Sequence, residues 1–123
     1  MMRKYLITVV ALLTSFMTAA AADFSGTWKG VLTPENRDPG SALVMLTQTG
    51  DVVTGTGGQD QGDRYEIRNG KVTGDTVTFD IQTGETVMRF VLKLEGDTLK
   101  GEVTRERDGR LQKATLDLKR DKS

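Results

Sequence analysis

The amino-acid sequence predicts an all-β protein, an eight-stranded antiparallel up-and-down β-barrel that follows a cleaved signal peptide. Three observations predict this fold. Apolar and polar residues alternate with a period of two after residue 22, as in strands with one buried face. No stretch keeps the three- and four-residue apolar spacing of a helix. A Gly-Asp pair followed by a strand-like segment recurs at Gly50, Gly74 and Gly96, about one hairpin apart.

The first 22 residues have the three-part pattern of a secretory signal peptide. Arg3 and Lys4 supply the positive start, the apolar run 5–17 follows, and small alanines end the segment. The run is shorter than the ~20 residues that a membrane-spanning helix needs. We therefore expect cleavage before Asp23, no membrane span afterwards, and a periplasmic or secreted protein in which residues 23–123 form one domain.

The composition excludes several classes of function. The chain has no cysteine and no histidine, which excludes disulfide scaffolds, thiolate zinc sites, and catalysis by Ser-His-Asp or Cys-His groups. After cleavage, 15 basic residues stand against 17 acidic ones. A nucleic-acid-binding protein usually shows a basic excess, so we expect no nucleic-acid partner.

The turn residues predict how neighbouring strands pair. In each Gly-Asp pair, glycine suits the first central position of a type II′ turn, which needs a positive φ. Gly84-Glu85 has the same form, and Asp108-Gly109 suits a type I′ turn. With these turns Phe79 faces Phe90, and the apolar residues of four consecutive strands fall on one face. A one-residue slip in any turn would break this agreement.

In the N-terminal half, the alternation of inward and outward residues is interrupted once, in the predicted strand 64–73. With a turn at Gly74-Asp75, Val72 faces Val77 but Ile67 falls on the polar face. A β-bulge at Asn69-Gly70 would correct this, because glycine there can adopt the left-handed conformation. Eight strands joined in order close into a barrel, since closure removes both sheet edges. The predicted strands are 24–32, 41–49, 51–57, 64–73, 76–83, 86–95, 98–106 and 110–119.

The two ends of the predicted barrel differ. The Gly-Asp turns close the end beside the N-terminus, whereas the opposite end carries two longer loops, 33–40 and 57–63. Polar residues occur on the inward face at that end, which favours a ligand-binding mouth; ordinary strand ends returning to solvent are the alternative. The predicted ligand-binding residues at the mouth are Tyr65, Arg105 and Gln112, together with Arg68 if no bulge intervenes in its strand. Phe79 and Phe90 are the predicted ligand-binding residues in the interior.

Neither a catalytic site nor a metal site is predicted. Asp60 and Asp63 lie in a glycine-rich loop but lack the dense oxygen-ligand pattern of a calcium loop. Glu102, Glu106 and Asp117 are candidate general acids or bases, yet the pattern does not bring them to a nucleophile. We expect a non-catalytic protein with no metal and no cofactor.

A second surface is predicted on the outside of the barrel. Val31, Leu43, Met45 and Val52 point outward on the first three strands. Together they can form an apolar patch of the kind that binds a protein partner. Scattered surface hydrophobic residues, which are normal in soluble proteins, are the alternative.

The segment Phe24-Ser25-Gly26-Thr27-Trp28 resembles the Gly-X-Trp start of the calycin barrels, such as lipocalins and avidins. Arg120 resembles the C-terminal basic residue that packs across this tryptophan in calycins. The segment Val53-Thr54-Gly55-Thr56 is similar to the avidin pattern, although avidins surround biotin with several tryptophans and this chain has one.

The mature chain as a whole is most similar to small secreted bacterial β-barrel proteins of unknown function. Periplasmic inhibitors of secreted metalloproteases also open with Ser-Gly-X-Trp, but they usually hold a disulfide that is absent here. Two functions are therefore expected: binding of a small apolar ligand or lipid in a calycin-like barrel, or binding of a protein, as a periplasmic protease inhibitor or an envelope accessory protein does.

Overall fold

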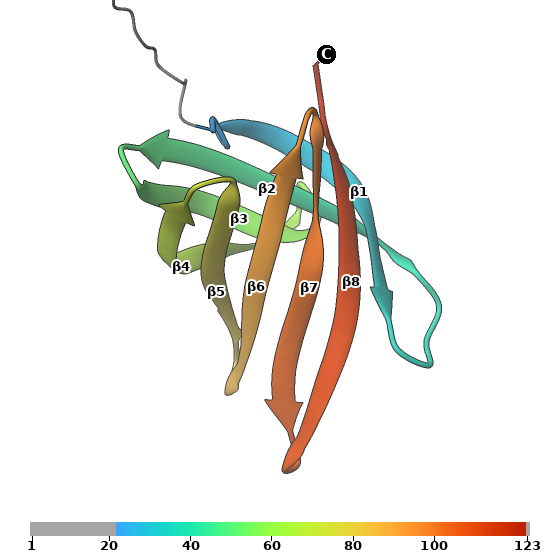
Figure 1. The fold of residues 1–123 in the computed structure, drawn as a ribbon. Coiled ribbons are helices and arrows are strands. Elements are labelled where there is room, and N and C mark those ends of the chain that lie inside the picture. Colours follow the sequence, from blue (N-terminus) through green and yellow to red (C-terminus); the bar gives the residue numbers. More distant parts are fainter. Residues whose placement is uncertain (1–21, 123) are drawn as a thin grey trace, which may run out of the picture.

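Eight antiparallel strands close into a barrel in a computed structural model that describes residues 22–122 (Figure 1). The strands follow the chain order, and the first pairs with the last. The predicted signal peptide lies outside the described residues, apart from Ala22. Within the described part, no helix is long and apolar enough to cross a membrane. The strands are β1 (Gly26–Pro34), β2 (Gly40–Thr49), β3 (Val52–Asp60), β4 (Asp63–Thr73), β5 (Thr76–Thr83), β6 (Thr86–Glu95), β7 (Thr98–Arg107) and β8 (Arg110–Arg120).

The predicted turns are confirmed. Gly50, Gly74, Gly84 and Gly96 have φ values of 65°, 62°, 64° and 64°, and the residue after each glycine keeps a negative φ, as a type II′ turn requires. In the β7–β8 hairpin both central residues of the Asp108-Gly109 turn have a positive φ, 54° and 75°, which is the type I′ geometry. The turns therefore set the register of the hairpins as expected.

The register of β5 to β8 is also confirmed. Phe79 pairs with Phe90, and their rings stack with centroids 4.7 Å apart. Leu92 on β6 pairs with Val77 on one side and Gly101 on the other. One apolar face is thus continuous around this half of the barrel, as the agreement of three turns predicted.

The loop predicted between the third and fourth strands is a tight turn instead. Asp60 and Asp63 pair across it, so both strands extend farther than the sequence indicated. The Gly62 amide donates a hydrogen bond of 2.9 Å to the Asp60 carboxylate, which stabilises the turn. The polar, glycine-rich composition of this segment concealed its strand structure. The loop between β1 and β2 is the only longer connection among the described residues.

The predicted bulge in β4 is present, with a different residue in the left-handed conformation. The register shifts between Arg68 and Lys71, and Asn69, rather than Gly70, has the positive φ of 56°. Asparagine tolerates this conformation better than most residues with a side chain. As a result Ile67 points inward, pairs with Ile81 and is only 5% exposed.

The hydrophobic core is most tightly buried at the end of the barrel where the described chain begins. Trp28, Leu118 and Leu99 are fully buried there. Toward the opposite end the inward residues Leu32, Met88 and Ala114 line a cavity. The interior is therefore packed at one end and hollowed at the other. The largest fully buried side chains are Trp28, Phe24, Phe79, Ile81, Leu92, Leu99, Leu118 and Val77.

Candidate functional site

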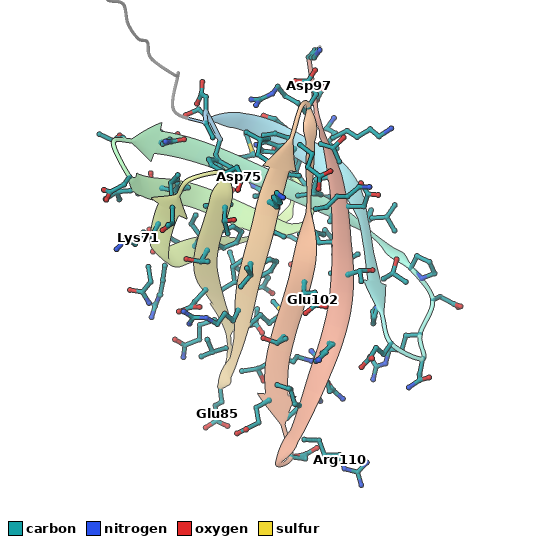
Figure 2. The ribbon with its side chains drawn as sticks, in the orientation of Figure 1. Lys71, Asp75, Glu85, Asp97, Glu102 and Arg110 are labelled. Atoms are coloured by element: carbon teal, nitrogen blue, oxygen red, sulfur yellow. The ribbon has the colours of Figure 1, made fainter. Side chains whose placement is uncertain are left out.

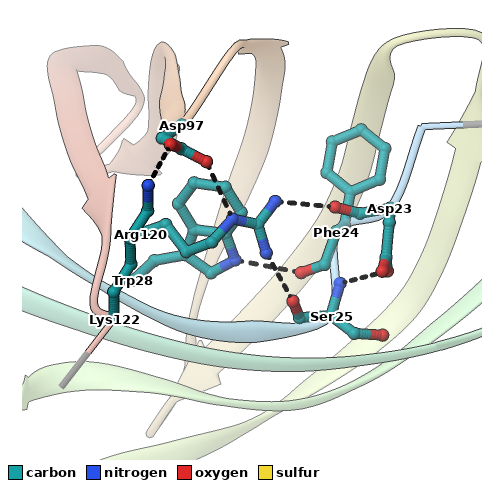
Figure 3. A network of polar contacts seen from close by, with 7 residues as sticks. All are labelled: Asp23, Phe24, Ser25, Trp28, Asp97, Arg120 and Lys122. Carbon is teal, nitrogen blue, oxygen red and sulfur yellow. Dashed lines mark hydrogen bonds and ion pairs between the residues drawn. The ribbon is translucent and has the colours of Figure 1, made fainter.

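The packed end of the barrel is sealed by Arg120 and Trp28 (Figure 3). The guanidinium carbon of Arg120 lies 4.3 Å from the centroid of the Trp28 ring, a cation–π contact. Arg120 also donates hydrogen bonds to the backbone oxygens of Ser25 (2.7 Å) and Asp23 (2.9 Å). The indole Nε1 of Trp28 donates to the Phe24 carbonyl at 2.9 Å. These contacts hold residues 23–25 across this end of the barrel.

Asp97 joins this network from the β6–β7 turn. Its carboxylate forms ion pairs with Lys122 at 2.6 Å and with Arg120 at 3.3 Å. The hydrogen bond and charge of Lys122, with a smaller effect of Arg120, lower the pKa of Asp97 below its ordinary value of 3.8. A carboxylate with a lowered pKa stabilises the fold above its unfolded-state pKa, and this contribution is lost as the pH falls through the folded-state pKa.

We expect the substitution Asp97→Asn to lower the free energy of unfolding at pH 7 by a small amount, because Asp97 is exposed. The difference from the wild type should be smaller at a pH well below 3.8, after the wild-type carboxyl has taken up its proton at its lowered pKa. Urea unfolding at the two pH values measures this. Asp75→Asn is the matched control, since Asp75 has the same turn position in the β4–β5 hairpin (Figure 2). A difference that is the same at both pH values would contradict the expectation.

The opposite end opens into a cavity with two lobes, here called the mouth. Figure 2 places Glu85 and Arg110 at this end of the barrel, with Asp97 at the other. The first lobe has a volume of about 420 Å³ and the second about 360 Å³. Both are within the range of small-molecule sites. The two lobes share the residues Leu32, Pro34, Arg37, Gln59 and Met88, so they meet in the barrel opening.

Arg105 and Gln112, two of the predicted mouth residues, line the first lobe. They pair across β7 and β8, and the Nε of Arg105 donates a 2.7 Å hydrogen bond to the Oε1 of Gln112. Arg105 also pairs with Met88 on β6. The inward register therefore places a half-buried arginine beside the apolar floor of the mouth.

The other predicted residues are distributed over the second lobe and the core. Tyr65 lines the second lobe and is 41% exposed. Phe90 lines the same lobe and is 7% exposed, while Phe79 packs behind it at 1% exposed. Arg68 does not join the mouth: the β4 bulge places Ile67 inward, and Arg68 donates to Gln82 on the exposed side of the barrel.

Several mouth residues were not predicted. Arg37 lies in the β1–β2 loop and lines both lobes. This loop is tied to β8 by a hydrogen bond of 3.1 Å from the Glu35 amide to the Lys113 carbonyl. The sequence placed this loop at the open end of the predicted barrel, and that placement was the signal that could have identified Arg37 as a mouth residue. Gln59 also lines both lobes, but it fell in a segment predicted to be a loop.

The residues of the predicted outer patch differ in exposure. Leu43 is only 4% exposed, which contradicts its predicted exposure, whereas Val31 and Val52 are 44% and 52% exposed. Val31 pairs with Ser41 near the mouth, and Val52 lies beside the turn at the packed end. The sulfur of Met45 lies 3.0 Å from the Nη1 of Arg64, whose side chain reaches across this part of the outer face.

Acidic side chains do not gather into a metal site in the described residues 22–122, where no group of three or more is placed to hold an ion. Asp60 instead accepts a hydrogen bond within its own turn. Comparisons of the chain with protein-family models, with curated proteins and with solved structures gave no match. Fold and site geometry are therefore the basis for assigning a function.

Proposed function

We propose that this protein is a non-catalytic binding protein of the periplasm or extracellular space, which holds a small molecule with an apolar body in the mouth. The observation that carries the proposal is the contrast between the two ends of the barrel. Large side chains and the Arg120 network fill one end, whereas Met88, Phe90 and Ile81 line an open hollow at the other. An eight-stranded barrel has room for one small ligand when side chains leave part of it empty.

The proposal extends to a calycin-like barrel. The segment that ends in Trp28 opens β1, and Arg120 on β8 pairs with that residue and packs over its ring. This arrangement supports the resemblance stated above for the same residues. Separation of Val31 from Val52 and burial of Leu43 weigh against the alternative of a protein-binding patch on the first three strands.

A neutral fluorescent probe, N-phenyl-1-naphthylamine, tests whether the mouth binds apolar molecules. We expect saturable binding to the wild type, and at least about tenfold weaker binding to Ala42→Leu, a difference of ~1.4 kcal/mol. Ala42 is 9% exposed on the inner face of β2 and lines the second lobe, so a leucine there occupies the space of the ligand.

Thr47→Leu is the matched control, because Thr47 lies on β2 with an exposed side chain. It should bind the probe within about twofold of the wild type. Both variants are first checked for a wild-type circular dichroism spectrum. Equal binding by wild type and Ala42→Leu, or no saturable binding by the wild type, would contradict the proposal.

A further inference from the structure

The first lobe of the mouth presents more positive than negative charge. Its lining includes four basic side chains, Arg37, Arg105, Arg110 and Lys113, and one acidic side chain, Glu35. The second lobe carries one basic and two acidic side chains, Arg37, Asp38 and Asp63. The excess of positive charge is therefore confined to the first lobe, so the two lobes of the mouth differ in charge.

Arg105 is the inward member of this basic group. It is only partly exposed, and it stands between Met88 and Gln112 on the neighbouring strands. Among residues 22–122 no carboxylate forms an ion pair with it; the contact made by its side chain is the hydrogen bond from Nε to Gln112. An inward arginine without an acidic partner in its own barrel is suited to an anion supplied from outside.

The hydrogen bond between Arg105 and Gln112 determines which groups face the lobe. Because Oε1 of Gln112 accepts from Arg105, the amide nitrogen of Gln112 is left as a donor. The four Nη hydrogens of Arg105 are donors as well, and a guanidinium has no acceptor. The pair therefore offers several donors to one bound group. A carboxylate, which only accepts hydrogen bonds when ionised, matches this pair.

The second lobe supplies the apolar part of the site. Val44, Ile81, Phe90 and Leu116 line it, while its acidic residues disfavour an anion there. Met88 lines both lobes and pairs directly with Arg105. An aliphatic chain that starts at Arg105 can thus pass over Met88 and continue along the apolar wall.

From this juxtaposition we infer that the ligand is an anionic amphiphile with an aliphatic body. Its carboxylate is bound by Arg105 and Gln112 in the first lobe, and its chain lies across Met88 in the second. This inference rests on the proposed binding function and adds the chemical class and the orientation of the ligand.

Three ligands with the same ten-carbon chain test the head group: decanoate, decan-1-ol and decylamine. Isothermal titration calorimetry at pH 7.5 and low salt should show decanoate binding at least about tenfold more tightly than decanol, as expected for hydrogen bonds to charged groups. Decylammonium should bind more weakly than decanol. The comparison uses the wild-type protein, so it does not depend on the folding of a variant.

Arg105→Gln tests the assigned residue. We expect it to weaken decanoate binding by about tenfold or more and to leave decanol binding within about twofold. Arg89→Gln is the matched control: it removes the same charge from the outer face, where Arg89 pairs with Thr104, the residue before Arg105. The control should bind decanoate within about twofold of the wild type, which separates a local contact from a change in overall charge.

The outcomes distinguish this inference from the proposed function. If decanol and N-phenyl-1-naphthylamine bind but decanoate binds no more tightly than decanol, the anionic class is overturned and the binding function stands. A decanoate affinity that is unchanged in Arg105→Gln overturns the role of Arg105. If none of the probes binds, both proposals are wrong.

Discussion

Replacing Trp28 with alanine is expected to lower the free energy of unfolding by about 3–5 kcal/mol, the usual loss for a large aromatic side chain in a core. Trp28 is fully buried and is packed in the core at the sealed end. Its removal leaves a cavity and deprives Arg120 of the ring over which the guanidinium lies. The Phe24 carbonyl also loses the donor that satisfies it in the buried interior.

The substitution Trp28→Phe separates packing from hydrogen bonding. Phenylalanine keeps an aromatic ring under Arg120 but has no donor for the Phe24 carbonyl, so we expect a smaller loss of about 1–3 kcal/mol. Urea unfolding followed by far-ultraviolet circular dichroism is the suitable measurement, because Trp28 is the only tryptophan and both variants lose its fluorescence. A loss below about 1 kcal/mol for Trp28→Ala would mean that this end is not held together by the tryptophan.

Gly30→Ala is expected to destabilise the fold by at least about 3 kcal/mol, the upper part of the range for overpacked cores. Gly30 lies in β1 at the seam where the barrel closes and pairs with Leu118 of β8. A Cβ at this position would collide with the backbone carbonyl of Asp117 and approach the Cα of Leu118. Because the obstacle is backbone, no side-chain rotation relieves the collision, and β1 must move away from β8.

Gly40→Ala provides the control for this substitution. Gly40 begins β2, and a Cβ there meets no atom within 4 Å. We expect a neutral effect or a gain of about 0.4–1 kcal/mol, since alanine restricts the unfolded chain more than glycine does. Thermal and urea unfolding of both variants would check the pair. Equal stabilities of Gly30→Ala and Gly40→Ala would contradict the expectation, because they would show that β1 and β8 accommodate a Cβ at Gly30 without cost.

The hairpins were predictable because local chemistry determines them. A glycine with positive φ at Gly74, Gly84 or Gly96 sets a two-residue turn, and a period of two then places every side chain. The polar segment from Gly57 to Asp63 was not predictable in the same way. Its strand structure depends on pairing between β3 and β4, which composition does not reveal.

The residues of the candidate site were predictable only where a tight turn sets the strand register and no bulge shifts it. Arg105 and Gln112 face each other because one type I′ turn relates them. The sequence offered two incompatible placements in β4, Arg68 at the mouth without a bulge or Ile67 inward with one. The additional residue of the bulge reverses the faces on either side of it, so Ile67 lies inward and Arg68 does not. A period-two pattern assigns Leu43 to the outer face but does not determine how exposed its side chain is there.

The described chain ends lie together at the sealed end of the barrel, where Arg120 binds the backbone of Asp23 (Figures 1 and 3). Attachment of the protein to a bead, a sensor surface or a fused carrier through either end would therefore turn the mouth toward the solution. The same arrangement would hold for a natural tether.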